Sequence, residues 1–311
     1  MYLLFRFFYK IKFNRNAFFI MKSLAEIRND FIKNLSSQYS SKEIDIIFYA
    51  LAENFLHKDK ITLKLGLDEM HEDSQIKSTL FQVALFHLIN GMPYQYVIGY
   101  TEFYGCKIMV NPNVLIPRPE TEELVDWISN DFENRNKELN IIDLCSGSGC
   151  IAIALAKKMK AKVSALEIDE KAVETAKKNA DINKVNVNFV QADIFDSTGN
   201  NEIIVMDDFD ILVSNPPYIR EYEKEAMDAR VVEHEPSKAL FVPDNDPFIF
   251  YRGIIHFAQK KLKPNGRVYV EINQDLGEKT RELFLDYFNY VELKQDLSGN
   301  FRMIKAKGIS L

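Results

Sequence analysis

The first third of the chain has apolar residues at helical spacing. Over residues 21–90 they recur every three or four positions, which predicts roughly four short helices. One helix is expected to begin at a capping box formed by Ser40 and Glu43. Another is expected over 74–90, and Gly91, which directly follows it, indicates where it ends. The segment is long enough for a small helical domain, with the apolar stripes as its core.

Beyond this segment the pattern changes to strands. Residues 94–110 are strand-like, with a hairpin expected around 102–105. From Ile141 onward, predicted strands and helices alternate, which is typical of a doubly wound parallel sheet. Near the C-terminus, segments 290–295 and 301–305 flank a turn-forming run. They predict a β-hairpin that adds an antiparallel strand at one side of the sheet. The expected fold class is therefore α/β.

Composition narrows the function classes. The 311 residues are 47% hydrophobic and 27% charged, which is ordinary for a soluble globular protein of two domains. The net charge of −6 argues against broad binding of a phosphate backbone. Three cysteines (Cys106, Cys145 and Cys150) are a poor disulfide framework and fit a reducing compartment, the cytoplasm. Their spacing is not that of a zinc site, so we predict no metal.

Residues 1–20 are basic and rich in aromatic side chains. A signal peptide is one interpretation, although Lys and Arg interrupt its apolar core. An amphipathic surface or targeting segment is another. We favour an upstream extension before a natural start at Met21. No later window has the roughly 20 unbroken apolar residues that a membrane span needs.

The most informative motif is Asn215-Pro216-Pro217-Tyr218, which follows an apolar run predicted as a buried strand. The prolines end that strand at its carboxyl end, where open α/β sheets bind ligands. Pro216 also biases Asn215 toward extended backbone, which holds its side-chain amide in place. The amide oxygen and a nearby backbone carbonyl could together accept a substrate NH2 group. The Tyr218 ring would add a flat wall for a planar group. The alternative interpretation of the motif is a turn with no catalytic or binding role.

A second candidate site follows the first strand of the α/β region. Cys145, Ser146, Gly147, Ser148 and Gly149 form a glycine-containing turn into a helix, where the backbone can approach a ligand closely. The next strand ends at Glu167, whose carboxylate could accept hydrogen bonds from both hydroxyls of a ribose. Asp193 follows the third strand and could reach an adenine edge.

By itself the glycine turn is ambiguous. Residues 147–152 also fit the dinucleotide-binding fingerprint of a nicotinamide-dependent oxidoreductase. A dehydrogenase has no need of the 215–218 motif, whereas an enzyme that transfers a methyl group to a planar nitrogen can use it to hold that nitrogen. The sulfonium of S-adenosylmethionine needs only a pocket for ribose, adenine and the amino-acid end.

Together, residues 143–149, Glu167 and the 215–218 motif resemble class I S-adenosylmethionine-dependent methyltransferases. Within that class, further segments are similar to the release-factor glutamine methyltransferase family: 99–104, 115–122, 235–240 and 296–299. The resemblance covers about residues 21–307, and its motifs keep their order. Glu167 stands where many relatives carry Asp, and the longer carboxylate can still reach a ribose.

The resemblance implies a helical substrate-binding domain over 21–92, a β-hairpin linker over 93–114 and a seven-stranded Rossmann-like methyltransferase domain over 115–311. It implies an S-adenosylmethionine site whose residues are Cys145, Ser146, Gly147, Ser148, Gly149, Glu167, Asp193, Ile194 and Asn215. The implied substrate is the glutamine of the Gly-Gly-Gln loop in peptide chain release factors. We expect a cytoplasmic monomer with no stable nucleic-acid or membrane partner.

The implied catalytic residues are Asn215, Pro216 and Tyr218, with Pro217 as a further substrate-binding residue. Our hypothesis is that the Asn215 side-chain oxygen and the Pro216 carbonyl accept the two N–H bonds of the substrate amide, while Tyr218 packs against its plane. Asp143 is expected to order the glycine loop. Arg118 either orders the linker or shapes the mouth of the pocket.

Three alternatives remain open. A ribosomal-protein glutamine methyltransferase would share both the motif and the reaction. A DNA adenine methyltransferase would need a target-recognition region and a basic groove for a flipped base, which the acidic balance disfavours. A binding module that keeps the fold without catalysis is disfavoured by the intact 215–218 motif.

Overall fold

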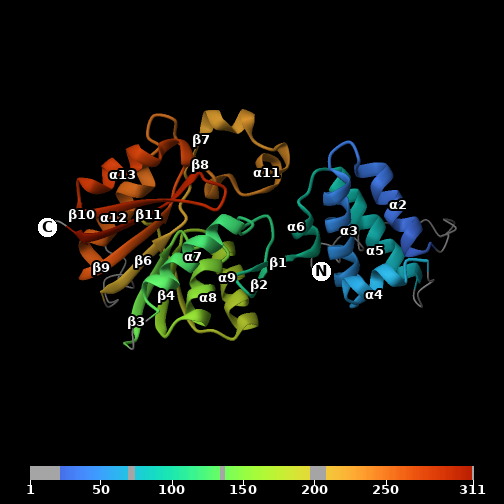
Figure 1. Cartoon of the computed structure of the whole chain (residues 1–311), viewed down its shortest axis with the longest axis horizontal. Helices are drawn as coiled ribbons and strands as arrows, with labels where there is room; N and C mark the ends of the chain where they lie inside the picture. The colour runs from blue at the N-terminus through green and yellow to red at the C-terminus, as the bar shows by residue number, and fades with distance from the viewer. Residues whose placement is uncertain (1–21, 69–73, 134–136, 197–207, 310–311) are drawn as a thin grey trace. The chain divides into compact units, whose positions relative to one another are not determined.

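The computed structural model describes residues 22–68, 74–133, 137–196 and 208–309, which form two compact units (Figure 1). One unit holds the described residues up to Gly99 together with Ala229–His234, and the other holds the remainder. The expected extension over 1–20 lies outside the described residues. No helix within the described ranges is both long and apolar enough to cross a membrane.

The first unit is helical. Its helices are α2 (Leu24–Leu35), α3 (Ser41–Leu56), α4 (Lys60–Leu65), α5 (Ser74–Ile89), α6 (Tyr94–Ile98) and α11 (Ala229–His234). The expected capping box starts α3, where Ser40 Oγ accepts from the Glu43 backbone and the Glu43 carboxylate accepts from the Ser40 backbone. The core is aromatic, since the buried Phe48 ring lies 5.6 Å from Phe31 and 5.8 Å from Phe81 between centroids.

Helix α11 belongs to this unit although it comes late in the chain. The Arg230 guanidinium lies 4.4 Å from the centre of the Tyr39 ring. A ring nitrogen of His234 lies 3.1 Å from the carbonyl oxygen of Asn90. The segment that follows the 215–218 motif therefore supplies one helix to the helical unit.

The second unit begins with the predicted hairpin, β1 (Tyr100–Phe103) paired antiparallel with β2 (Cys106–Met109). Its two loop residues, Tyr104 and Gly105, both have positive φ, at 47° and 70°. Such a turn matches the right-handed twist of paired strands and explains the glycine. The hairpin prediction is confirmed, whereas the prediction that the strand-like segment begins at residue 94 is wrong, because Tyr94–Ile98 form the short helix α6.

A seven-stranded sheet forms the centre of this unit, in the order β10-β11-β9-β6-β3-β4-β5. The strands are β3 (Leu139–Leu144), β4 (Ala161–Glu167), β5 (Val187–Gln191), β6 (Phe209–Ser214), β9 (Leu262–Glu271), β10 (Phe288–Gln295) and β11 (Phe301–Ile309). Strand β11 runs antiparallel to both of its neighbours, and the other pairings are parallel. Both the α/β fold and the C-terminal hairpin were correctly predicted.

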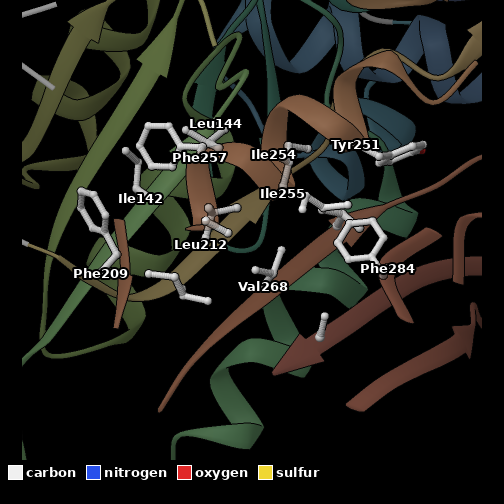
Figure 2. Close-up of a cluster of buried hydrophobic side chains, with 14 of the residues drawn as sticks. Ile142, Leu144, Phe209, Leu212, Tyr251, Ile254, Ile255, Phe257, Val268 and Phe284 are labelled. Carbon is white, nitrogen blue, oxygen red and sulfur yellow. The ribbon is translucent and has the colours of Figure 1, made fainter. Parts of the chain in front are cut away.

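Helices cover both faces of the sheet (Figure 1). They are α7 (Pro119–Asp131), α8 (Cys150–Lys158) and α9 (Glu170–Asn183) on one face, with α12 (Ile249–Lys261) and α13 (Gly277–Leu285) on the other. Figure 2 shows the core under the second pair, where Leu212 and Val268 of the strands meet Ile254 and Phe284 of the helices. This apolar layer fixes the strands whose carboxyl ends carry the site.

Beyond β6 the chain forms a further, two-stranded sheet. Strand β7 (Ile219–Arg220) pairs in parallel with β8 (Phe241–Val242). Three short 3-10 turns complete the unit: η1 (Glu221–Ala226), η2 (Ser237–Ala239) and η3 (Gln274–Leu276). The β7–β8 pair brings the residues on both sides of α11 back to the second unit.

Candidate active site

A cavity of about 400 Å³ is lined by residues that follow β3, β4, β5 and β6. That volume lies within the range of about 300–1,000 Å³ typical of ligand sites. The predicted residues that line it are Cys145, Ser146, Gly147, Ser148, Glu167, Asp193, Ile194, Asn215 and Pro217. Gly149, Pro216 and Tyr218 lie beside this lining and are not part of it. The fold thus brings the two motif regions to one cavity.

The two glycines of the turn have different surroundings. Gly149 begins α8 with φ of 77°, and a Cβ atom there would lie 3.0 Å from Ala176 Cβ and 3.1 Å from the Phe189 ring. Gly147 has φ of 53°, and a Cβ atom would meet no protein atom within 4 Å. Gly149 therefore serves close packing of α8 on the sheet, while Gly147 leaves open space beside the cavity.

Glu167 organises the glycine turn from the end of β4. One carboxylate oxygen accepts from the Gly147 N–H at 2.8 Å, and the other accepts from the Asp169 N–H at 3.0 Å. Burial raises the pKa of Glu167, and the backbone N–H donors oppose that rise. Each oxygen keeps a further lone-pair site, so the carboxylate can also accept from ligand hydroxyls.

Asp143 lies fully buried at the other side of the turn. Its Oδ2 accepts from the Ala152 N–H in the first turn of α8, at 3.2 Å. Burial raises the pKa of Asp143 to about 8, and the Ala152 N–H opposes the rise. Among the described residues, its Oδ1 and the buried Ser146 Oγ have no hydrogen-bond partner. Buried polar atoms are rarely left unpaired, and because Ser146 lines the cavity, its hydroxyl fits a site completed by a polar ligand.

Asn215 stands at the end of β6, and its side chain is held in place. Its Nδ2 donates to Thr121 Oγ1 at 3.2 Å. The Thr121 hydroxyl donates to Glu271 at 2.7 Å, and the Tyr218 hydroxyl donates to the other oxygen of the same carboxylate at 2.9 Å. Sequence reasoning had not singled out Glu271. The available signal was an acidic residue inside the otherwise apolar run 268–272.

Arg118 joins two motifs that are far apart in the chain. Its guanidinium lies 2.7 Å from Glu235, whose side chain is 1% exposed. The other Glu235 oxygen accepts from the backbone N–H of Ile116 at 3.2 Å. Arg118 also lines the cavity. Both predicted roles are thus compatible with its position: it orders the segment after the hairpin and shapes the cavity wall.

Comparison with known proteins decides the family. The Methyltransferase small domain family matches residues 121–239, which include Asn215 and most of the cavity. A release factor glutamine methyltransferase of Flavobacterium psychrophilum is 43% identical over 90% of this chain and 97% of its own length. One from Bacteroides thetaiotaomicron is 37% identical over 94% of this chain and 99% of its own length.

The chain belongs to the release factor glutamine methyltransferase family. The resemblance drawn from the motifs is thereby confirmed. Among solved structures, the hMettl16 catalytic domain in complex with MAT2A 3′UTR hairpin 6 matches with a TM-score of 0.50 at 14% identity. That match covers 76% of this chain and 83% of the other, and it supports the methyltransferase fold alone.

The cavity has features that suit the S-adenosylmethionine expected from the sequence motifs. Glu167 offers an acceptor for ribose hydroxyls, and Gly147 leaves room for close approach. The Ser146 hydroxyl lines the cavity and has no hydrogen-bond partner among the described residues, so it can pair with a polar group of the ligand. The acceptors and the open space at this turn therefore fit S-adenosylmethionine.

Proposed function

We propose that the protein transfers a methyl group from S-adenosylmethionine to the side-chain amide nitrogen of the glutamine in the Gly-Gly-Gln loop of peptide chain release factors. The observation that carries this proposal is the position of Asn215 on the wall of the cavity. Its hydrogen bond to Thr121 uses Nδ2, which leaves Oδ1 as an acceptor for a substrate N–H.

The cofactor would be held by the residues predicted from the sequence. Those residues are Cys145, Ser146, Gly147, Ser148, Gly149, Glu167, Asp193, Ile194 and Asn215, of which Asn215 is proposed to act mainly on the substrate. When bound, S-adenosylmethionine supplies a methyl group activated by its sulfonium. Glu167 would accept from the ribose hydroxyls, and Asp193 would reach the adenine edge. Gly149 would act indirectly, because its close packing sets the start of α8.

The substrate amide needs help because its nitrogen lone pair is delocalised into the carbonyl. Asn215 Oδ1 and the Pro216 backbone carbonyl would accept its two N–H bonds and fix the nitrogen toward the methyl group. Such positioning can contribute about 7–11 kcal/mol to lowering the barrier. Acceptors placed where charge develops can add about 3–4 kcal/mol. Tyr218 would pack against the amide plane.

The helical segment 21–92 is proposed to bind the release factor outside its glutamine loop. On α4, Ile61 is 72% and Leu65 is 85% exposed, and their spacing of four residues places them on one helix face. An exposed apolar face suits a protein partner. The protein is proposed to act as a cytoplasmic monomer.

The proposal is tested by transfer of a labelled methyl group from S-adenosylmethionine to purified release factor. A release factor with Gln→Ala in its Gly-Gly-Gln loop is the control. Ribosomal protein and DNA are the competing acceptors. Label on the wild-type release factor alone supports the proposal. Label on ribosomal protein or DNA instead would keep the methyltransferase assignment and overturn the substrate.

A further inference from the structure

Two buried polar side chains lie next to Asn215: Thr121, which also lines the cavity, and Glu271, which does not. Strands β6 and β9 are parallel neighbours with Ser214 opposite Val270, so Asn215 and Glu271 follow side by side at their carboxyl ends. Thr121 reaches the same place from the first turn of α7. Thr121 and Glu271 are each only 2% exposed, so the hydroxyl and the carboxylate form their hydrogen bonds mainly with protein groups and not with bulk water.

The chemistry of these groups gives their hydrogen bonds a direction. When Glu271 is ionised, its carboxylate only accepts, and the Thr121 hydroxyl then donates its single proton to it across 2.7 Å. Thr121 Oγ1 can then only accept from Asn215, 3.2 Å away, and Nδ2 is the sole donor of that amide. The two ends of an asparagine amide are otherwise hard to tell apart. Here Glu271 determines, through Thr121, that Oδ1 is the end left for the substrate.

The same carboxylate holds the far end of the motif. Its other oxygen accepts from the Tyr218 hydroxyl at 2.9 Å. Burial raises the pKa of Glu271, and the Thr121 and Tyr218 hydroxyls oppose that rise because they stabilise the ionised form. One buried carboxylate thus orients both the acceptor and the ring proposed to contact the substrate amide.

We propose that Thr121 and Glu271 are positioning residues for methyl transfer, forming a relay that fixes the Asn215 amide with Oδ1 toward the substrate nitrogen. The proposal rests on the function proposed above. It assigns a role to the threonine of the 115–122 segment and to an acidic residue at the end of β9. Neither residue needs to touch the substrate, because each acts through the groups it holds.

The kinetic test uses variants of Thr121 with release factor as substrate. Thr121→Val keeps the shape of the side chain and removes the hydroxyl that links Asn215 to Glu271. We expect kcat to fall by about threefold if only one hydrogen bond is lost, and by up to about a hundredfold if the Asn215 amide is misplaced. The KM for S-adenosylmethionine should change little. Thr121→Ser keeps the hydroxyl and should restore activity. Thr280→Val is the matched control, because Thr280 is fully buried and its hydroxyl donates to Leu276 O, within the η3–α13 segment.

A double variant separates positioning from general damage. If Thr121 acts through Asn215, adding Thr121→Val to Asn215→Ala should lower kcat no further. The proposal is overturned if Thr121→Val lowers kcat by the same factor in both backgrounds, or if Thr121→Ser is as poor as Thr121→Val.

A second readout does not depend on the reaction. In protein made with isotope-labelled asparagine, the Nδ2 protons of Asn215 can be assigned by their loss in Asn215→Ala. Their exchange with water should be slower in the wild type than in Thr121→Val. Equal exchange would overturn the relay whatever the activity. Slow exchange with no methylation of release factor would instead overturn the proposed function and leave the relay in place.

Discussion

Replacing Gly149 by alanine should destabilise the second unit, which holds the cavity and is called the catalytic unit below, more than the same change at Gly105. Both glycines have left-handed backbone, with φ of 77° and 70°. An L-residue there costs about 1–2 kcal/mol. A Cβ atom at Gly105 meets nothing within 4 Å, whereas at Gly149 it would lie 3.0 Å from Ala176 Cβ and 3.1 Å from the Phe189 ring.

The extra crowding sets the size of the expected difference. Overpacking a well-packed site costs about 1–3 kcal/mol. Gly105→Ala is therefore expected to lose about 1–2 kcal/mol of unfolding free energy, and Gly149→Ala about 2–5 kcal/mol. The entropy that alanine removes from the unfolded chain is the same at both positions and cancels in the comparison.

Tryptophan fluorescence provides the assay. The chain has a single tryptophan, Trp127, which is buried on α7 within the catalytic unit. Its signal during urea denaturation therefore reports unfolding of that unit, and equal slopes allow the midpoints to be compared directly. Equal losses in the two variants would refute the argument that Gly149 is required for close packing rather than for backbone conformation alone.

Three further variants test the cavity. Asn215→Ala should lower kcat by about 10²–10³, as loss of one preorganised polar partner does, with cofactor affinity nearly intact by calorimetry; an equal loss of cofactor binding would make Asn215 a cofactor residue instead. Glu167→Gln should weaken binding of S-adenosylhomocysteine by about ten- to a hundredfold, because a neutral amide replaces a charged acceptor at the glycine turn; an unchanged Kd in titration calorimetry would contradict this. Burial raises the pKa of Asp143 from 3.8 to about 8, so the folded state keeps a proton that the unfolded state releases. The stability from this group is full below the unfolded pKa and is lost as pH rises through about 8. Asp143→Asn stays neutral, so its Tm should fall less between pH 3.8 and about 8 than the Tm of the wild type. An unchanged slope of Tm against pH would show that Asp143 is ionised in the folded protein.

Much of the fold could be predicted from residues that are close together in the sequence. The Ser40–Glu43 capping box is a contact between residues three apart, and the hairpin turn at Tyr104 and Gly105 is set by neighbouring residues. The strand before Asn215 ends where its prolines predicted. Each of these features depends on a few adjacent side chains, so periodicity and turn chemistry were enough to find them.

The contacts behind the site had no such signal. Thr121 and Glu271 are 150 residues apart, and Arg118 and Glu235 are 117 apart. Their meeting depends on the strand order, in which β9 lies beside β6, and helix and strand periodicity carries no information on that order. For the same reason, periodicity could not predict that α11, which follows the 215–218 motif, belongs to the helical unit.

The most direct test of the proposed function locates the methyl group on the product. Release factor incubated with the protein and S-adenosylmethionine is digested, and the Gly-Gly-Gln peptide is fragmented in a mass spectrometer. The account predicts one added methyl group on the side-chain nitrogen of that glutamine, present with the wild-type enzyme and strongly reduced with Asn215→Ala. A methyl group on any other residue, or equal modification by both enzymes, would contradict it.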